Sequence, residues 1–255
     1  MRDLLRSRLK PGGLRTMPFP DGAAPLPPRF RGRPLLDPNG CPGGCRDCAE
    51  RAPSGVLARD PAGRVVVDVG ACLFSPDEAA ACPAGALTYS GDYRMATTGR
   101  PQLLTVDGEI ELARALDEQA RRLFGRSLKL RSVVAGSCNG CEAELAALGN
   151  VVFDLARFGV QFVASPRHAD GIVVTGAVNV NMTEALRRTY EAVPDPKIVI
   201  AVGACAINGG PFRGSPEVAG GVDGQLPVDL WIPGCPPHPY TLLDGLLRLL
   251  GREMK

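Results

Sequence analysis

The stretch Leu128-Lys-Leu-Arg-Ser-Val-Val-Ala-Gly-Ser-Cys-Asn-Gly-Cys-Glu142 decides the fold of this chain. Its first part, Leu128–Ala135, is rich in apolar and β-branched residues, which predicts a buried strand. The residues that follow the two cysteines, Glu142–Phe158, have helical periodicity with a break near Gly149. A strand, a short glycine-rich turn and a helix in this order predict the start of a β-α-β unit.

The same alternation of strands and helices continues toward the end of the chain. The further expected strands are Gln161–Ala164, Gly171–Thr175, Lys197–Val202 and Leu230–Ile232, and the further expected helices are Met182–Ala192 and Tyr240–Leu250. Strands that alternate with helices favour a parallel sheet that is covered on both faces. We therefore expect an α/β domain over residues 127–255, with ligands bound beyond the carboxyl ends of its strands.

Four cysteines follow three of these expected strands. Cys138 and Cys141 form a C-x-x-C pair, whereas Cys205 and Cys235 each lie in a loop rich in glycine or proline. Loops at the carboxyl ends of parallel strands can converge, and four thiolates suit either a [4Fe–4S] cluster or a tetrahedral zinc ion. The C-x-x-C pair alone could be a redox dithiol, but that interpretation leaves the other two cysteines unexplained.

The other five cysteines lie in residues 37–99. This segment is too short for a large hydrophobic core, so it needs a further stabilising element such as a bound metal cluster. Its expected strand is Arg64–Val69. Two-cluster ferredoxins carry two runs of C-x₂-C-x₂-C-x₃-C-P, and the fourth cysteine of each run binds the other cluster. The first run here is Cys41, Cys45, Cys48 and then Ala52, with one extra residue between the first two cysteines; the second run is Cys72, Ser75, Glu78 and Cys82.

Sorting these positions by cluster gives an uneven result. One cluster keeps all of its ligands, which are Cys41, Cys45, Cys48 and Cys82, while the other keeps only Cys72. The pattern predicts one [4Fe–4S] cluster in this segment, with Cys72 as a free thiol. The alternative is a zinc knuckle built from Cys41, Cys45, Cys48 and one more ligand.

The remaining segments carry charge and connect the domains. Residues 1–36 form an expected extended arm, and residues 1–35 hold eight Lys or Arg against two Asp or Glu. Such an arm either docks on a partner or is a solvated tail. Residues 100–126 are an expected linker with a helix over Glu109–Phe124. We expect neither a secretory signal nor a membrane-spanning helix, so any membrane association is expected to be peripheral.

The C-terminal motifs resemble one family over residues 127–250. They are Ser137-Cys-Asn-Gly-Cys-Glu, Ser165-Pro-Arg-His-Ala-Asp, Thr175-Gly-Ala-Val, Pro194-Asp-Pro-Lys, Gly203-Ala-Cys and Ile232-Pro-Gly-Cys-Pro-Pro. Their order resembles the small subunit of energy-converting [NiFe]-hydrogenases of the formate hydrogenlyase type, a family that includes a cluster-bearing subunit of complex I. The resemblance implies a flavodoxin-like fold and a proximal [4Fe–4S] cluster on Cys138, Cys141, Cys205 and Cys235. The C-x-x-C spacing is the hydrogenase-like form, because complex I has adjacent cysteines there.

The N-terminal motifs resemble a neighbouring subunit of such complexes over residues 28–105. They are Phe30-Arg-Gly-Arg-Pro, Cys82-Pro-Ala-Gly-Ala-Leu and Tyr89-Ser-Gly-Asp-Tyr, and they resemble the polyferredoxin subunit. We therefore expect a ferredoxin-like α+β domain fused to the flavodoxin-like domain. Fusion fixes the distance between two redox centres.

The resemblance implies an electron-transfer subunit of a membrane-associated [NiFe]-hydrogenase complex, with two [4Fe–4S] clusters. The expected partners are the [NiFe]-hydrogenase large subunit, other hydrogenase-complex subunits including membrane subunits, and a ferredoxin or formate dehydrogenase. The expected location is the cytoplasmic side of the cell membrane. Two alternatives are a complex I-like quinone- or ferredoxin-linked oxidoreductase without hydrogenase activity, and a zinc-stapled assembly module.

Few other residues indicate chemistry. Glu142 and Glu144 favour a helix N-terminus, or one of them lies at the large-subunit interface and moves protons. His168 and His238 lack the spacing of cluster ligands and are expected to be structural or interfacial. The chain has no nucleotide-binding glycine motif. Few aromatic residues interleave the basic arm, so no nucleic-acid partner is expected.

Overall fold

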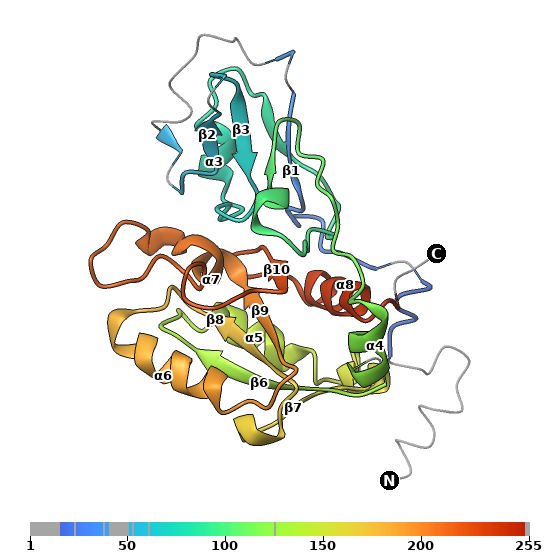
Figure 1. Ribbon diagram of the computed structural model, residues 1–255. Helices are drawn as coiled ribbons and strands as arrows, with labels where there is room; N and C mark the ends of the chain where they lie inside the picture. Colours follow the sequence, from blue (N-terminus) through green and yellow to red (C-terminus); the bar gives the residue numbers. More distant parts are fainter. Residues whose placement is uncertain are drawn as a thin grey trace.

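The protein consists of a larger α/β domain and a smaller N-terminal unit that lies against one end of it (Figure 1). The computed structural model describes residues 16–22, 24–37, 39–40, 51–52, 54–60, 62–124 and 126–252. Cys41, Cys45, Cys48 and the first fifteen residues of the basic arm lie outside the described residues.

The larger domain is built on a five-stranded parallel sheet. Its strands are β6 (Leu128–Val134), β7 (Val160–Phe162), β8 (Gly171–Thr175), β9 (Ile198–Val202) and β10 (Leu230–Ile232). Their spatial order is β10-β9-β8-β6-β7, and every neighbouring pair is parallel. Counted from β6, this is the order 2-1-3-4-5 of flavodoxin-like sheets. The expected flavodoxin-like α/β fold of this domain is therefore confirmed.

Helices cover both faces of this sheet because its central strands are apolar on both sides. The helices are α5 (Gly140–Ala147), α6 (Val180–Glu191), α7 (Gly203–Asn208) and α8 (Pro239–Leu249). Alternate residues of β8 and β9 enter two different cores, since side chains alternate across a strand. Ile172 and Val199 pack on the side of α6, while Val173 and Ile200 pack on the side of α5 and α8.

The described residues of the N-terminal unit form two small antiparallel sheets that accompany a short helix. The elements are β1 (Pro34–Leu36), β2 (Leu57–Arg59), β3 (Val65–Asp68), α3 (Pro76–Ala80), β4 (Leu87–Tyr89), the 3₁₀ turn η1 (Arg100–Leu103) and β5 (Leu104–Thr105). β1 pairs with β4, and β3 lies between β2 and β5. Of these strands, only β3 matches one expected from the sequence.

The two parts share one hydrophobic core. Leu57, Val67 and Leu103 of the N-terminal unit belong to the same buried cluster as Ile207 and Trp231 of the larger domain. Thr97 and Trp231 also form an antiparallel bridge with backbone hydrogen bonds of 2.8 and 3.0 Å. The shared core holds the N-terminal unit at the end of the sheet where β10 leads into its loop.

The linker departs from its expected conformation. A helix was expected over Glu109–Phe124, but only α4 (Glu118–Phe124) is helical. Before α4, the amides of Ala113 and Leu116 donate to the carbonyls of Ala96 and Leu249 instead of closing helical turns. Of the apolar residues that gave the helical pattern, Ala113 is buried, and Leu116 and Ala120 are partly buried, in the core that contains α8, whereas Leu123 is 55% exposed.

The described part of the arm is packed, not free. The Phe19 ring is 6% exposed and lies 5.4 Å from the ring of Tyr240 and 6.1 Å from that of Tyr93. The Met17 amide donates to the carbonyl of Val152 at 2.9 Å. Residues 16–22 therefore dock on the larger domain of the same chain. Among the described residues, no helix is long and apolar enough to cross a membrane.

Candidate metal centre

The four cysteines of the larger domain line a single small cavity. Cys138, Cys141, Cys205 and Cys235 all contribute to its wall, with Gly140 and Gly176 among the other lining residues. The sulfur-bearing residues come from the chain segments after β6, β9 and β10, which end at the same edge of the parallel sheet. The convergence expected from the sequence is therefore present in the structure.

Each cysteine is held by a different local element. Cys138 lies in the turn after β6, Cys141 is in the first turn of α5, and Cys235 is in the loop after β10. Cys205 was expected in a loop but lies on α7, which begins directly after β9. The Ala204 amide donates to the Gly234 carbonyl at 2.8 Å, which ties the Cys205 turn to the Cys235 loop.

Two glycines leave room for the sulfurs. A Cβ atom on Gly203 would lie 2.6 Å from the Sγ of Cys141, and one on Gly210 would lie 2.8 Å from the Sγ of Cys205. Both glycines have positive φ angles, of 87° and 53°, which side-chain-bearing residues rarely adopt. The backbone therefore approaches two of the four sulfurs more closely than any other residue type allows.

The electrostatics of the cavity oppose four free thiolates. Burial, followed by the charge of Glu142, raises the pKa of Cys141 well above its ordinary value. Burial and the neighbouring Cys235 and Cys138 raise the pKa of Cys205 to about 11, and burial also raises that of Cys235. Four thiolates so placed repel one another, and a positively charged metal core reverses that repulsion.

The cavity offers more space than a single ion requires. Its volume is about 60 Å³, whereas a cavity needs about 10–15 Å³ to hold one water molecule. Among the described residues, no group of three or more His, Cys, Asp or Glu side chains is already arranged to hold a metal ion. The donor set consists of four sulfurs around a larger space, which fits a polynuclear iron–sulfur core.

Glu142 connects the cysteine pair to the centre of the sheet. Its carboxylate accepts a hydrogen bond from the Ser137 hydroxyl at 2.8 Å and another from the Thr175 hydroxyl. Thr175 is fully buried at the carboxyl end of β8. Glu142 does lie in the first turn of α5, as expected, but its bonds to Ser137 and Thr175 were not foreseen from the sequence.

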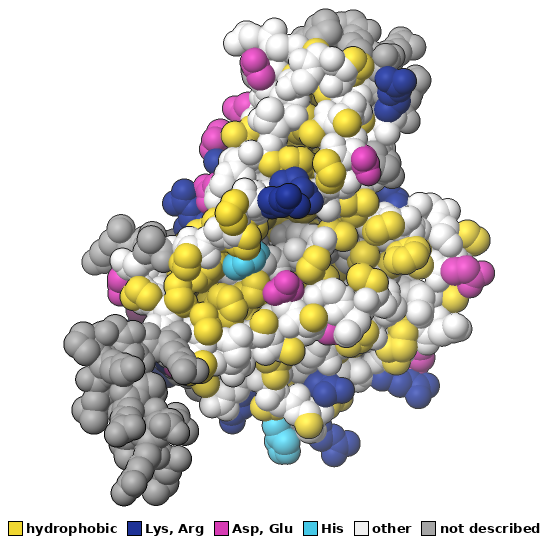
Figure 2. Space-filling view, turned by 180° about the vertical axis from the view of Figure 1, so that it is seen from behind, with side chains coloured by type: hydrophobic (Ala, Val, Ile, Leu, Met, Phe, Trp, Pro, Cys, Tyr) yellow, Lys and Arg dark blue, Asp and Glu magenta, His cyan; other side chains and the backbone are white. Residues whose placement is uncertain are grey.

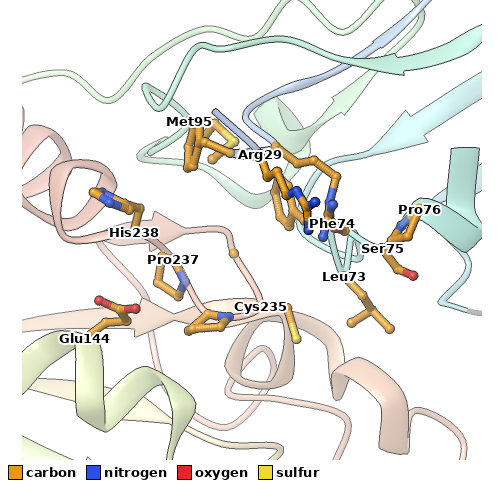
Figure 3. Close-up of a pocket in the computed structure, with 14 residues that line it drawn as sticks. Arg29, Leu73, Phe74, Ser75, Pro76, Met95, Glu144, Cys235, Pro237 and His238 are labelled. Atoms are coloured by element: carbon orange, nitrogen blue, oxygen red, sulfur yellow. Dashed lines mark hydrogen bonds between the residues drawn. The ribbon is translucent and has the colours of Figure 1, made fainter. Parts of the chain in front are cut away.

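A second and larger cavity adjoins the first at Cys235. Its volume is about 430 Å³, and Glu144 and His238 lie on one side of it, facing Arg29 and Phe74 across the gap (Figure 3). Burial raises the pKa of Glu144 and lowers that of His238. The Nδ1 atom of His238 accepts the Tyr240 amide at 3.2 Å and caps α8, so this histidine has the structural role expected of it.

The described part of the N-terminal cysteine set lies around α3. Cys82 follows this helix, is 8% exposed, and accepts the Ala86 amide at Sγ at 3.3 Å. Cys72 is fully buried and lies 3.4 Å from the Oε2 of Glu78. Ser75 and Glu78 form a capping box at the start of α3. The spacing Ser75-Pro-Asp-Glu78 is the sequence signature of such a box, so the capping role of Glu78 could have been predicted from the sequence.

Comparison with known proteins places the larger domain in one family. Residues 138–249 match the family described as NADH ubiquinone oxidoreductase, 20 Kd subunit. The probable membrane-bound hydrogenase subunit mbhJ of Pyrococcus furiosus is 44% identical over 54% of this chain and 82% of its own length. An NADH-quinone oxidoreductase subunit of Bacteroides thetaiotaomicron is 48% identical over 49% of this chain. Formate hydrogenlyase subunit 7 of Escherichia coli is 43% identical over 60% of this chain.

The extent of these matches is uneven. The matched regions span 64% of the Bacteroides subunit and 59% of the Escherichia subunit. The family match begins at residue 138, so it leaves the N-terminal unit outside. The match to the Pyrococcus subunit, by contrast, takes in 82% of that relative at 44% identity. The chain therefore belongs to the family of the NADH:ubiquinone oxidoreductase 20 kDa subunit, together with membrane-bound hydrogenase and formate hydrogenlyase subunits.

Proposed function

We propose that this chain carries a [4Fe–4S] cluster on Cys138, Cys141, Cys205 and Cys235 and transfers electrons in a membrane-associated [NiFe]-hydrogenase complex. The observation that carries the proposal is the convergence of four cysteines from three strand ends on one cavity. Such a cluster supplies one-electron transfer when it is bound. The chain's own residues hold it, exclude water from its buried side and place Glu142 beside it.

Family membership narrows the class of reaction. The chain is an oxidoreductase subunit, since its relatives are subunits of hydrogenases and of NADH-quinone oxidoreductases. The hydrogenase assignment rests on the spacing of Cys138 and Cys141 and on the Pyrococcus and Escherichia relatives. The reaction centre is proposed to lie on a separate large subunit, and this chain is proposed to relay electrons to or from it.

A second [4Fe–4S] cluster is proposed in the N-terminal unit, on Cys41, Cys45, Cys48 and Cys82. Two contacts support this grouping. The Asp37 amide donates to the Ala86 carbonyl at 3.0 Å. A Cβ atom on Gly40, the residue before Cys41 in the sequence, would lie 3.6 Å from the Cβ of Ala86. The Ala86 amide in turn donates to the sulfur of Cys82. Gly40, which is next to Ala86, therefore lies close to the turn that holds the buried Cys82.

The proposed partners follow from the relatives. Those relatives are subunits of a membrane-bound hydrogenase and of an NADH-quinone oxidoreductase. We place this chain at the cytoplasmic side of the cell membrane, bound to a [NiFe]-hydrogenase large subunit and to membrane subunits. A ferredoxin or a formate dehydrogenase is the proposed electron partner. The exposed Cys138 marks the side of the centre that a partner would cover.

Metal analysis of the anaerobically purified chain tests the two clusters. We expect about eight irons per chain, four from each cluster. Reduction should give an electron paramagnetic resonance signal of the cubane type. Zinc at the same sites, without a signal on reduction, would remove the basis for electron transfer.

One rival function has an observation in its favour. The Bacteroides relative, an NADH-quinone oxidoreductase subunit, is 48% identical to this chain, which supports a complex I-like quinone- or ferredoxin-linked oxidoreductase without hydrogenase activity. Purification of the native complex separates the two functions. Nickel in the co-purified large subunit and H₂-dependent dye reduction are expected for the hydrogenase. A complex without nickel that still reduces quinone would establish the rival.

A further inference from the structure

A buried carboxylate lies in the second cysteine run of the N-terminal unit. In this run, Ser75 and Glu78 stand where a two-cluster ferredoxin has cysteines. Glu78 and Cys72 are fully buried, and Ser54 is 4% exposed. No cation neutralises Glu78 among the ion pairs of the described residues. A buried carboxylate needs hydrogen-bond or charge partners, because burial without them is strongly unfavourable.

Hydrogen-bond donors bind the carboxylate from three directions. The Oε1 atom of Glu78 accepts the Leu73 amide at 2.9 Å and the Ser54 hydroxyl. The Oε2 atom accepts the Ser75 amide at 3.1 Å and the Tyr89 hydroxyl at 2.9 Å. The Cys72 thiol also donates to Oε2, at 3.4 Å, so five donors hold one carboxylate, which fills its capacity.

The loop before α3 has the shape of an anion-binding nest. Phe74 has a φ of 55°, which is rare for a residue with a large side chain. Because of this turn, three successive amides point to one side. Those of Leu73 and Ser75 reach Glu78, and that of Phe74 reaches the Sγ of Cys72 at 3.3 Å. Nests of this kind bind phosphates and iron–sulfur clusters.

The positions around this nest are those of a missing cluster. Cys72, Ser75 and Glu78 occupy the first three places of the second ferredoxin run, and Ala52 occupies the place of the remaining ligand. Ala52 is buried, and Ser54, two residues further on, contacts Glu78. One thiol, one serine, one carboxylate and one alanine do not fit a [4Fe–4S] cluster, which requires four strong ligands.

We propose that the Glu78 carboxylate replaces the missing cluster as the anion of this nest, so that the N-terminal unit keeps a cluster-binding loop without a cluster. A ligated [4Fe–4S] cluster and a carboxylate are both anions that accept backbone N–H bonds. Replacement of one by the other therefore preserves the loop. The proposal rests on the ferredoxin-like interpretation of the N-terminal unit given above.

The replaced site faces the proposed cluster of the larger domain. Leu73 and Ser75 line the same cavity as Cys235 (Figure 3). In Figure 2, a hollow lies beneath basic side chains, between the two parts of the protein. The loop whose amides bind the Glu78 carboxylate therefore lies on the side of the N-terminal unit that faces the proposed cluster.

The first arm of the test rebuilds the cluster in the full chain. Ala52→Cys, Ser75→Cys and Glu78→Cys are combined, with Cys72 as the fourth ligand. We expect the triple variant to bind four more irons per chain than wild type after anaerobic reconstitution. A folded triple variant with the wild-type iron content would overturn the proposal. The comparison is an increment over wild type, so it is independent of whether wild type itself holds eight irons.

The second arm removes the charge and keeps the shape. Glu78→Gln should lower the apparent unfolding temperature by roughly 5 °C, because a neutral amide accepts fewer of the donors. Glu109→Gln is the matched control, since Glu109 is an exposed partner of Arg33, and it should leave the temperature nearly unchanged. If the triple variant does not fold, the second arm alone tests the proposal. Equal unfolding temperatures for Glu78→Gln and wild type would then refute the replacement.

Discussion

Substitution of Gly203 by alanine gives the sharpest test of the cysteine cavity. The new Cβ atom would lie 2.6 Å from the Sγ of Cys141, whereas ordinary contact begins at about 3.4 Å. The sulfur must therefore move by about 0.8 Å, and metal–ligand distances tolerate only about 0.2 Å. The positive φ adds about 1–2 kcal/mol of strain. We expect the variant to fold but to lose the iron of this centre.

Gly220→Ala separates the contact from the strain. Gly220 has a φ of 81°, close to the 87° of Gly203, but a Cβ atom there meets nothing within 4 Å. Both variants pay the conformational cost, and only Gly203→Ala disturbs a sulfur. The assay is iron and acid-labile sulfide per chain after anaerobic purification. Gly203→Ala should lose about half of the iron and Gly220→Ala none. Full iron in Gly203→Ala would refute the account of the cavity.

Three further predictions concern the N-terminal cluster, Glu142 and the arm. Cys72→Ser should leave the iron content unchanged, whereas Cys82→Ser should lower it by about half; an equal loss in both would contradict the single N-terminal cluster. Glu142→Gln should raise the reduction potential of the neighbouring cluster in a redox titration, since it removes a negative charge. Glu191 is exposed, and Glu191→Gln should leave this potential unchanged. Equal cluster potentials in Glu142→Gln and wild type would contradict an effect of the Glu142 charge on the cluster. Phe19→Ala should cost about 3 kcal/mol in thermal unfolding, as for other buried rings; no loss would mean that the arm does not dock.

Much of the larger domain could be predicted because its strands are marked by apolar, β-branched runs. Gly171–Thr175 and Leu230–Ile232 have the expected bounds. The cysteines were found because each follows such a run. Cys205 was misplaced in a loop, since six residues of α7 are too few to show helical periodicity.

The errors lie where tertiary contacts override local pattern. The residues before Glu118 carry a helical spacing of apolar side chains, yet their amides bond to Ala96 and Leu249, which are distant in sequence. β1 and β4 have three residues each, and their pairing joins segments more than fifty residues apart. The interaction of Ser54 and Tyr89 with Glu78 is equally non-local. Sequence pattern alone contains no information about such pairs.

The central claim is that Cys138, Cys141, Cys205 and Cys235 hold a redox-active [4Fe–4S] cluster. The most direct measurement is Mössbauer spectroscopy of the ⁵⁷Fe-loaded chain, as isolated and after reduction, on wild type and on Cys205→Ser. We expect cubane iron in wild type and a loss of about four irons per chain in the variant. The same cubane spectrum and iron content in Cys205→Ser, or a wild-type chain that binds zinc in place of iron, would contradict the central claim.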